Sequence, residues 1–176
     1  MESRVIIVNE SDEVIGTLET RAAHDGEGVR HRAFMILIHN PRGEVLLCRR
    51  SQLKRLWAGH WENSCSSHPL PGETCLQAGA RRLREELGIS ADLEVVGCFE
   101  YHAVDGDAGA EHEVCFVLAG PYDGEPTPDP TEVAEWRWHA LDQLLVSAGR
   151  DHWAPWLQPG LELLAAHLKG REELPE

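Results

Sequence analysis

Short apolar segments separated by polar turns mark the first part of the chain. Residues 4–9 (RVIIVN) and 33–39 (AFMILIH) are apolar runs of the length that is typical of buried strands. Residues 40–43 (NPRG) have the turn chemistry of a hairpin, and residues 44–49 return as its second strand. The polar residues 10–13 indicate a turn after the first strand. We therefore expect three early strands, the last two joined as a hairpin.

An amphipathic helix is predicted in the middle of the chain. It opens at residues 71–73 (PGE) and ends at about Leu87, because Gly88 suits a helix C-terminus. Its apolar positions recur at helical spacing along one stripe: Leu76, Ala80, Leu83 and Leu87. Oppositely charged residues stand four apart on other faces, as Arg82 with Glu86 and Arg81 with Glu85.

The rest of the chain alternates further strands and helices around one polar loop. The pattern predicts strands at residues 93–102, 113–119 and 134–139, and helices at 141–147 and 159–168. Residues 120–131 are rich in Pro, Gly and Asp and indicate an exposed loop, and the charged residues 170–176 indicate a frayed tail. We expect one domain over residues 1–176, of mixed α+β or α/β class, because strands surround one strong helix and no linker divides the chain.

Composition and charge narrow the classes of function. Hydrophobic content of 42% and charged content of 26% are ordinary for a globular protein. The formal charge of −14 argues against nucleic-acid and anionic-membrane partners, and no apolar stretch is long enough for a membrane helix. The five cysteines form no CxxC pair, and no signal peptide opens the chain, so we predict reduced thiols and a cytoplasmic location.

Glu73, Arg81 and the run 85–89 (EELGI) on and before the predicted helix resemble a degenerate Nudix box, the pattern Gly-x5-Glu-x7-Arg-Glu-apolar-x-Glu-Glu-x-Gly-apolar. Ser67 replaces the opening Gly of this pattern, and Arg82 replaces the first helix Glu. Carboxylates gathered on such a helix can hold Mg²⁺ against a diphosphate. An arginine at position 82 weakens a hydrolase interpretation and could instead contact phosphate oxygens directly.

The run Trp61-Glu62-Asn63-Ser64-Cys65-Ser66-Ser67-His68-Pro69 resembles the active-site segment of type I isopentenyl-diphosphate isomerases, a branch of the Nudix superfamily. The resemblance extends from about Arg4 to Trp156. It implies a Nudix-type α/β/α sandwich with a mixed sheet and a central Nudix helix. It also implies interconversion of isopentenyl and dimethylallyl diphosphate by protonation and deprotonation through a tertiary carbocation.

The family holds one divalent metal in a site of three His and two Glu. The resemblance assigns that site to His24, His31, His68, Glu111 and Glu113. Such a ligand set suits Mn²⁺, Zn²⁺ or Mg²⁺. Glu111 and Glu113 are two apart, so in a strand both face the same side and His112 faces away.

The resemblance also assigns residues to the diphosphate. Arg50, Lys54 and Arg82 match the family's phosphate contacts, and Glu86 matches the acidic residue that reaches a Mg²⁺ bound with the diphosphate. Thr20 stands where the family usually has Lys. Its neighbour Arg21 would point elsewhere if that segment is extended.

The proton-transfer groups complete the implied site. Glu113 and Tyr101 match the pair that acts on one face of the alkene, and the ring of Trp156 matches the one that stacks near the cation. Ser66 stands where the family usually carries its catalytic Cys. Cys65 is one residue too early and would point to the other side of an extended segment.

Ser66 leaves several interpretations open. The protein can be a natural serine variant that remains an isomerase, an enzyme acting on another prenyl diphosphate, for example as a cyclase, or an engineered Cys→Ser trap. Two further classes are a Nudix pyrophosphohydrolase and an inactive binder of a prenyl diphosphate. The substrate is in most of these cases a small prenyl diphosphate, and we expect a monomer or weak homodimer.

Overall fold

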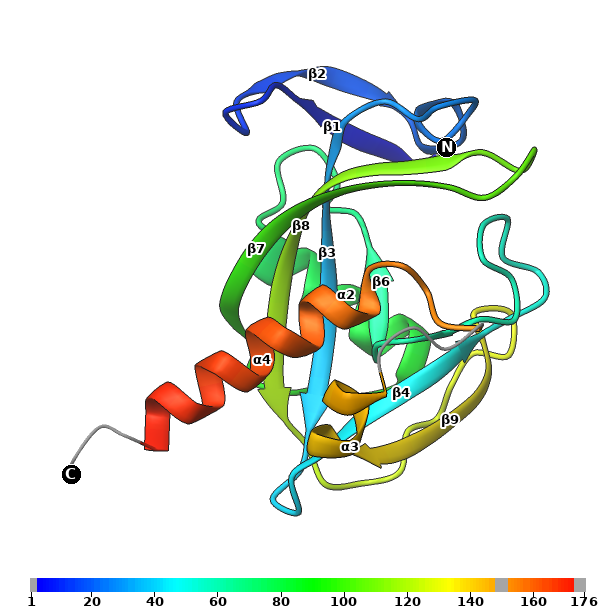
Figure 1. Ribbon diagram of the computed structural model, residues 1–176. Helices are drawn as coiled ribbons and strands as arrows, with labels where there is room; N and C mark the ends of the chain where they lie inside the picture. Colours follow the sequence, from blue (N-terminus) through cyan, green and yellow to red (C-terminus); the bar gives the residue numbers. More distant parts are fainter. Residues whose placement is uncertain (1–2, 148–151, 173–176) are drawn as a thin grey trace.

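A computed structural model describes residues 3–147 and 152–172 of the chain. In these residues a nine-stranded mixed sheet lies between helix α2 (Cys75–Leu87) on one face and helix α4 (Leu157–Glu172) on the other. Figure 1 shows the two helices on either side of the central strands. The predicted mixed fold with helices on both faces of a sheet is confirmed.

The N-terminal strand pairs with a strand that the sequence pattern does not reveal. β1 (Arg4–Val8) runs antiparallel to β2 (Val14–Glu19), across a turn at residues 10–11. β2 is exposed along almost its whole length, so it has no buried positions that would give a hydrophobic period. The short helix α1 (Thr20–Ala23) follows directly, where an extended segment was considered for Arg21.

The central strand β3 (His31–His39) organises the sheet. It pairs with the parallel strand β8 (Ala110–Pro121) on one side and with the short antiparallel strand β6 (Cys65–Ser67) on the other. β7 (Glu94–Val104) extends the sheet beyond β8 as its antiparallel hairpin partner. β7 and β8 extend beyond the predicted ranges 93–102 and 113–119, because the ladder between them continues through the pairs Ala103–Glu111 and Val104–Ala110.

The predicted hairpin of residues 33–49 is only partly correct. Its turn forms, since the backbone N–H of Asn40 binds the carbonyl of Glu44. However, β3 and β4 (Glu44–Arg50) share a single residue pair, His39 with Val45, before they diverge. β3 and β4 separate after this pair, because each of them pairs with other strands.

Beyond the pair His39–Val45, β4 forms a second part of the sheet with strands other than β3. It pairs with β5 (Trp61–Glu62) and with β9 (Val133–Ala140), both antiparallel. Helix α3 (Leu141–Val146) follows β9 and packs against α4. β5 and β6 contain two and three residues, which is too short for a periodicity to show in the sequence.

Helix α2 begins later than predicted, because Thr74 caps it. The Thr74 hydroxyl accepts from the backbone N–H of Gln77, whose side chain in turn accepts from the backbone N–H of Thr74. Gly88 ends the helix in the left-handed conformation, at φ 66°, as predicted. The predicted stripe is wrong at Leu76, which is 39% exposed, whereas Leu83 and Leu87 are buried.

Two hydrophobic cores fill the spaces on the two faces of the sheet. The core below α2 contains Phe34, Ile36 and Leu83, and the core below α4 contains Met35, Leu37 and Leu161. This alternation along β3 follows from the period of two in a strand. α4 extends through Glu172, so the predicted frayed tail is wrong for residues 170–172, and residues 173–176 lie outside the described residues.

In the part of the chain that the structure describes, no helix is long and apolar enough to span a membrane.

Candidate active site

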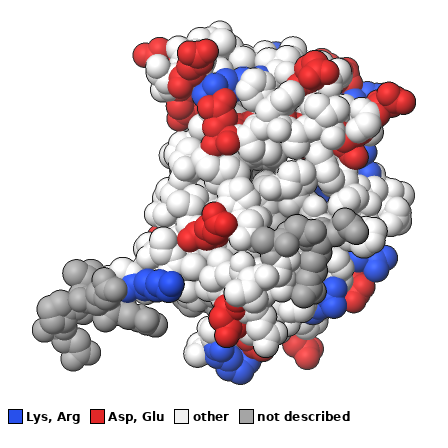
Figure 2. Space-filling model, in the orientation of Figure 1, with Lys and Arg blue, Asp and Glu red and all other residues white. Residues whose placement is uncertain are grey.

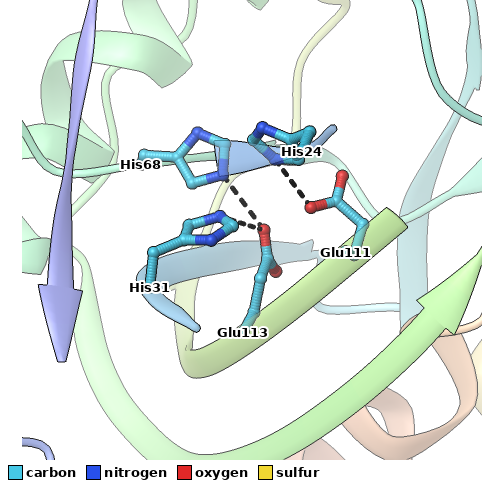
Figure 3. Close-up of side chains that lie close together, drawn as sticks. All are labelled: His24, His31, His68, Glu111 and Glu113. Carbon is cyan, nitrogen blue, oxygen red and sulfur yellow. Dashed lines mark hydrogen bonds and ion pairs between the residues drawn. The ribbon is translucent and has the colours of Figure 1, made fainter. Parts of the chain in front are cut away.

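Three histidines and two glutamates converge near one end of the sheet. His24 follows α1, His31 opens β3, His68 follows β6, and Glu111 and Glu113 lie on β8. Each offers one ligand atom, and these atoms lie within 4.8 Å of one another. Figure 3 shows the imidazoles and carboxylates turned toward a common centre. The structure therefore brings together all five residues that the resemblance assigns to a metal.

The five side chains already contact one another as nitrogen–oxygen pairs. His24 Nε2 lies 2.8 Å from Glu111 Oε2, and His68 Nε2 lies 3.0 Å from Glu113 Oε1. His31 Nε2 lies 3.5 Å from the same Glu113 oxygen. The imidazole rings stack edge to face or tilted, with centroids 4.7–5.1 Å apart.

The histidine rings have the orientation that a metal ligand needs. Nδ1 of His24 lies 2.6 Å from the carbonyl oxygen of Thr20, and Nδ1 of His31 lies 2.6 Å from that of Val29. A carbonyl can only accept, so each Nδ1 carries the proton and each Nε2 presents a lone pair to the centre. His31 Nε2 is fully buried and makes no hydrogen bond to any described residue. A buried lone pair of this kind, beside two carboxylates, fits a divalent cation.

Burial and mutual charge set the protonation of the cluster. Burial lowers the pKa of His68 to about 4, so its ring is neutral at pH 7. Burial and the charge of Glu113 raise the pKa of Glu111 to about 7. Burial alone would also raise the pKa of Glu113, but the hydrogen bond with His68 and the nearby ring of His31 hold it well below its ordinary value. Glu113 is therefore the carboxylate that stays ionised.

Tyr101 joins this cluster through Glu113. The two residues are directly paired across β7 and β8, and the Tyr101 hydroxyl donates to Glu113 Oε2 over 2.7 Å. Burial, together with the charge of Glu113, raises the pKa of Tyr101 well above its ordinary value. The hydroxyl thus keeps its proton and presents it to a carboxylate.

Ser66 faces the same side of the sheet as Glu113, across β3. Ser66 pairs with Met35, whose side chain packs in the core below α4, whereas Cys65 pairs with Ile36 in the core below α2. Ser66 lines the cavity, and Cys65 is 1% exposed, with burial raising the pKa of its thiol well above the ordinary value. Cys65 therefore points away from the site, in agreement with the offset expected from the sequence.

Trp156 forms the wall of the cavity at the start of α4. Its ring packs edge-on against Trp57, with centroids 5.3 Å apart, and tilted against Tyr101 at 5.9 Å. The guanidinium carbon of Arg50 lies 5.4 Å from the ring centroid. The ring is buried at 3% exposure yet lines the cavity.

A cavity of about 670 Å³ contains these groups and a set of cations. The predicted phosphate contacts Arg50, Lys54 and Arg82 all line it, and so does Thr20. Arg21 lines it too, because the segment is helical and not extended. The remaining cation of its wall is Arg55. Sequence reasoning did not identify Arg55, since nothing in the local pattern separates it from a surface arginine.

The three predicted phosphate contacts, Arg50, Lys54 and Arg82, are each bound to carboxylate or carbonyl oxygens of the protein. Arg50 is buried and donates to the Leu56 carbonyl and to Glu62, the latter over 2.9 Å. Lys54 pairs with Glu132, which also accepts from Arg82 Nη2 over 2.8 Å. Glu132 stands in the stretch before β9, and no signal in the sequence marks it as part of the site.

Glu86 lies apart from the five-residue cluster. It is 3% exposed, does not line the cavity, and its Oε1 lies 2.5 Å from Arg82 Nη2. Burial raises the pKa of Glu86 against the opposing charges of Lys54 and Arg82. Glu86 therefore lies beside two of the predicted phosphate contacts and apart from the histidine cluster, and its role with a Mg²⁺ stays a prediction.

The cations of the cavity contrast with the acidic surface. The face in Figure 2 shows acidic side chains gathered around the end formed by β1 and β2, with a largely uncharged middle. The chain carries 30 acidic and 16 basic residues, so the five cations of the cavity wall are a local concentration. A local excess of cations in a cavity of an acidic protein favours a small anion over a polyanion.

A Nudix domain model matches residues 29–158, which is most of the chain. A Deinococcus radiodurans protein of known crystal structure is 25% identical and superposes with a TM-score of 0.73, covering 91% of this chain and 98% of its own. The MutT protein of Methanosarcina mazei, at 21% identity and a TM-score of 0.65, shares the fold over 82% of this chain and 96% of its own. The chain is thus a Nudix-domain protein.

Curated relatives define the branch. The isopentenyl-diphosphate Delta-isomerase of Halorhodospira halophila is 45% identical over 77% of this chain and 79% of its own. The enzyme of the same name from Nocardia farcinica is 41% identical over 92% of this chain and 94% of its own. The chain belongs to the isopentenyl-diphosphate Delta-isomerase family.

Proposed function

We propose that the protein interconverts isopentenyl diphosphate and dimethylallyl diphosphate. The observation that carries this proposal is the cavity in which Glu113 and Tyr101 face Ser66 across β3, beneath the ring of Trp156. Relatives of that name cover almost the whole chain. Incubation with isopentenyl diphosphate and Mg²⁺, followed by NMR of the allylic product, tests the proposal.

The five-residue cluster supports one divalent metal ion as cofactor. His24, His31, His68, Glu111 and Glu113 would hold it, and three nitrogens with two carboxylates suit Mn²⁺, Zn²⁺ or Mg²⁺. When bound, the ion would supply positive charge that tunes the acidity of a ligating carboxyl group. A separate Mg²⁺ entering with the diphosphate is the proposed partner of Glu86.

The side chains of the cavity divide the proposed reaction between them. Arg50, Lys54 and Arg82 bind the diphosphate and so place the alkene between Glu113 and Ser66. The proton of the Tyr101 hydroxyl, shared with Glu113 in their hydrogen bond, passes to the alkene carbon, and the positive charge that develops lies against the π face of Trp156. A proton of the neighbouring carbon then passes to a lone pair of Ser66 Oγ and on to a phosphate oxygen of the substrate, and the electrons of the broken C–H bond form the new double bond.

Replacing Ser66 by cysteine should increase kcat by about tenfold or more. A thiol with an ordinary pKa near 8.5 exchanges protons at neutral pH far more readily than a serine hydroxyl. The measurement is the steady-state rate of isomerisation of Ser66→Cys beside the wild type. Ser90→Cys is the matched control, because Ser90 is exposed and does not line the cavity.

An unchanged or lower kcat in Ser66→Cys would show that the group at position 66 does not limit turnover. Binding and turnover measured on the wild type also distinguish an active isomerase from an inactive binder. Binding of isopentenyl diphosphate without turnover, together with activity of Ser66→Cys, would identify the wild type as an inactive binder.

Arg82, which stands where the Nudix box has a glutamate, is proposed to bind the diphosphate of the substrate. Arg82→Gln should raise KM for isopentenyl diphosphate by about 10–100-fold, because a charge-assisted hydrogen bond contributes about 1.5–3 kcal/mol. kcat should change much less, since Arg82 does not contact Glu113 or Tyr101. Arg84→Gln is the control, because Arg84 lies exposed on the same helix. Equal KM values for the two variants would remove Arg82 from the diphosphate site.

Two predictions from the sequence concern the protein outside its site. The cytoplasmic location and the state of monomer or weak homodimer stay predictions. Light scattering over a range of protein concentrations measures the second of them.

A further inference from the structure

Asn63 lies beneath the cavity and uses its whole side chain in hydrogen bonds. It is fully buried between β5 and β6 and does not line the cavity. Its Nδ2 donates to the carbonyls of Ile36 at 3.1 Å and Cys65 at 2.7 Å. Its Oδ1 lies 3.0 Å from Ser66 Oγ and 3.1 Å from Trp156 Nε1. Two donors and two acceptor positions are thus all satisfied.

The partners of Asn63 fix which end of its amide faces the cavity. Backbone carbonyls only accept, so the nitrogen must face Ile36 and Cys65. An indole N–H only donates, so the oxygen must face Trp156. A flipped amide would lose all three contacts. The orientation of Asn63 therefore follows from its neighbours alone.

This orientation decides where the proton of Ser66 points. Since Asn63 Oδ1 can only accept, the Ser66 hydroxyl must be the donor of their shared hydrogen bond. The proton of Ser66 is directed down to Asn63, and its lone pairs are left for the cavity that Ser66 lines. The same oxygen holds the edge of the Trp156 ring, so the two groups are fixed relative to each other.

We infer that Asn63 is a positioning residue of the active site, whose single oxygen fixes both the Ser66 hydroxyl and the Trp156 ring. Its role in turnover rests on the proposed isomerisation. Its role in geometry does not, because the four hydrogen bonds exist without substrate. The two roles can therefore be measured separately.

Asn63→Leu should lower kcat by about 10–100-fold and leave KM nearly unchanged, as expected for a residue that orients reacting groups without touching substrate. In the free protein, the Nε1–H proton resonance of Trp156 should move upfield and exchange faster with solvent. Trp156→Phe identifies that resonance, because it removes only that signal. The measurements are steady-state kinetics and ¹H–¹⁵N NMR of the indole region.

Asn40→Leu is the matched control. Asn40 is also buried and also bonds the backbone, but its partners Arg42 and Glu44 lie in the turn and at the first residue of β4. It should lose stability without a change in kcat or in the Trp156 resonance. Asn63→Asp is the conservative variant, since it keeps an oxygen at the Oδ1 position and should retain more of the kcat than Asn63→Leu. Asn63→Ser, whose hydroxyl is too short to reach both donors, replaces the leucine variant if that does not fold.

A Trp156 resonance that stays unchanged in the Asn63 variants overturns the inference, whatever the activity. So does a kcat that falls equally in the Asn40 and Asn63 variants, because the loss would then be structural. If the wild type does not isomerise its substrate, the proposed function fails, and the NMR result alone decides the positioning role.

Discussion

Replacing Glu113 by glutamine should reduce kcat at least about a thousandfold, the largest effect expected for any single residue of this site. Glu113 is the ionised carboxylate of the cluster, held by His31, His68 and the Tyr101 hydroxyl. Glutamine has the same shape but cannot accept a proton at neutral pH, and its amide N–H would oppose the donors around it. Steady-state kinetics of isomerisation measure the loss.

Two companion variants separate the roles of Glu113. Tyr101→Phe removes the hydroxyl that donates to Glu113 but no metal ligand, so it should lose activity while keeping its metal. His112 lies next to Glu113 on β8, but its ring packs against His102, away from the cluster. The variant His112→Gln should therefore behave as the wild type. A Glu113→Gln enzyme within tenfold of the wild type would contradict the proposed proton transfer.

Removing the divalent metal should abolish isomerisation, by at least about a hundredfold, and also destabilise the protein. Three imidazoles and two carboxylates buried together are stabilised by a cation, and a ligand at one hundred times its Kd contributes about 2.7 kcal/mol to folding. For a chain of this size that corresponds to a fall in Tm of about 5–10 °C. Chelation followed by metal analysis, calorimetry and activity measurement tests both effects.

His31→Ala should reproduce the effect of chelation, because His31 Nε2 is a buried nitrogen of the cluster that makes no hydrogen bond to any described residue. His102→Ala is the control, since its ring binds the exposed carbonyl of Glu27. Equal metal content in His31→Ala and the wild type would exclude the cluster as the metal site.

Metal affinity should also fall as the pH is lowered from 8 to 6. Ligands must be deprotonated to bind, and burial with the charge of Glu113 raises the pKa of Glu111 to about 7. Burial opposes the charged form of His24, yet the hydrogen bond and charge of Glu111 raise its pKa above the ordinary value. A larger fraction of both groups is therefore protonated at pH 6 than at pH 8, and protons compete with the metal for them. Titration calorimetry at two pH values measures this change.

The sequence predicted the buried strands and the capped helix best. β3, β4, β8 and α2 carry apolar positions whose spacing follows from which face is buried. β2 was missed because its side chains are exposed, and β5 and β6 because they are too short to show a period. The divergence of β3 from β4 depends on distant partner strands, which no local pattern contains.

The sequence predicts a contact within the site only where the residues involved lie close together in the chain. The alternation of Glu111 and Glu113 follows from the strand alone, and the structure confirms that His112 points away. The convergence of His24, His31 and His68 came from the family resemblance, since no spacing in the sequence brings them together. Asn63 and Trp156 are 93 residues apart, so their contact depends on the placement of α4.

The central claim is isomerisation by protonation and deprotonation at this cavity. The most direct test is to incubate the purified protein with isopentenyl diphosphate and Mg²⁺ in D₂O and follow the products by NMR. Dimethylallyl diphosphate carrying deuterium in a methyl group, formed by the wild type and not by Glu113→Gln, is the result that we predict. Unchanged isopentenyl diphosphate, or release of inorganic phosphate without an allylic product, would contradict the claim.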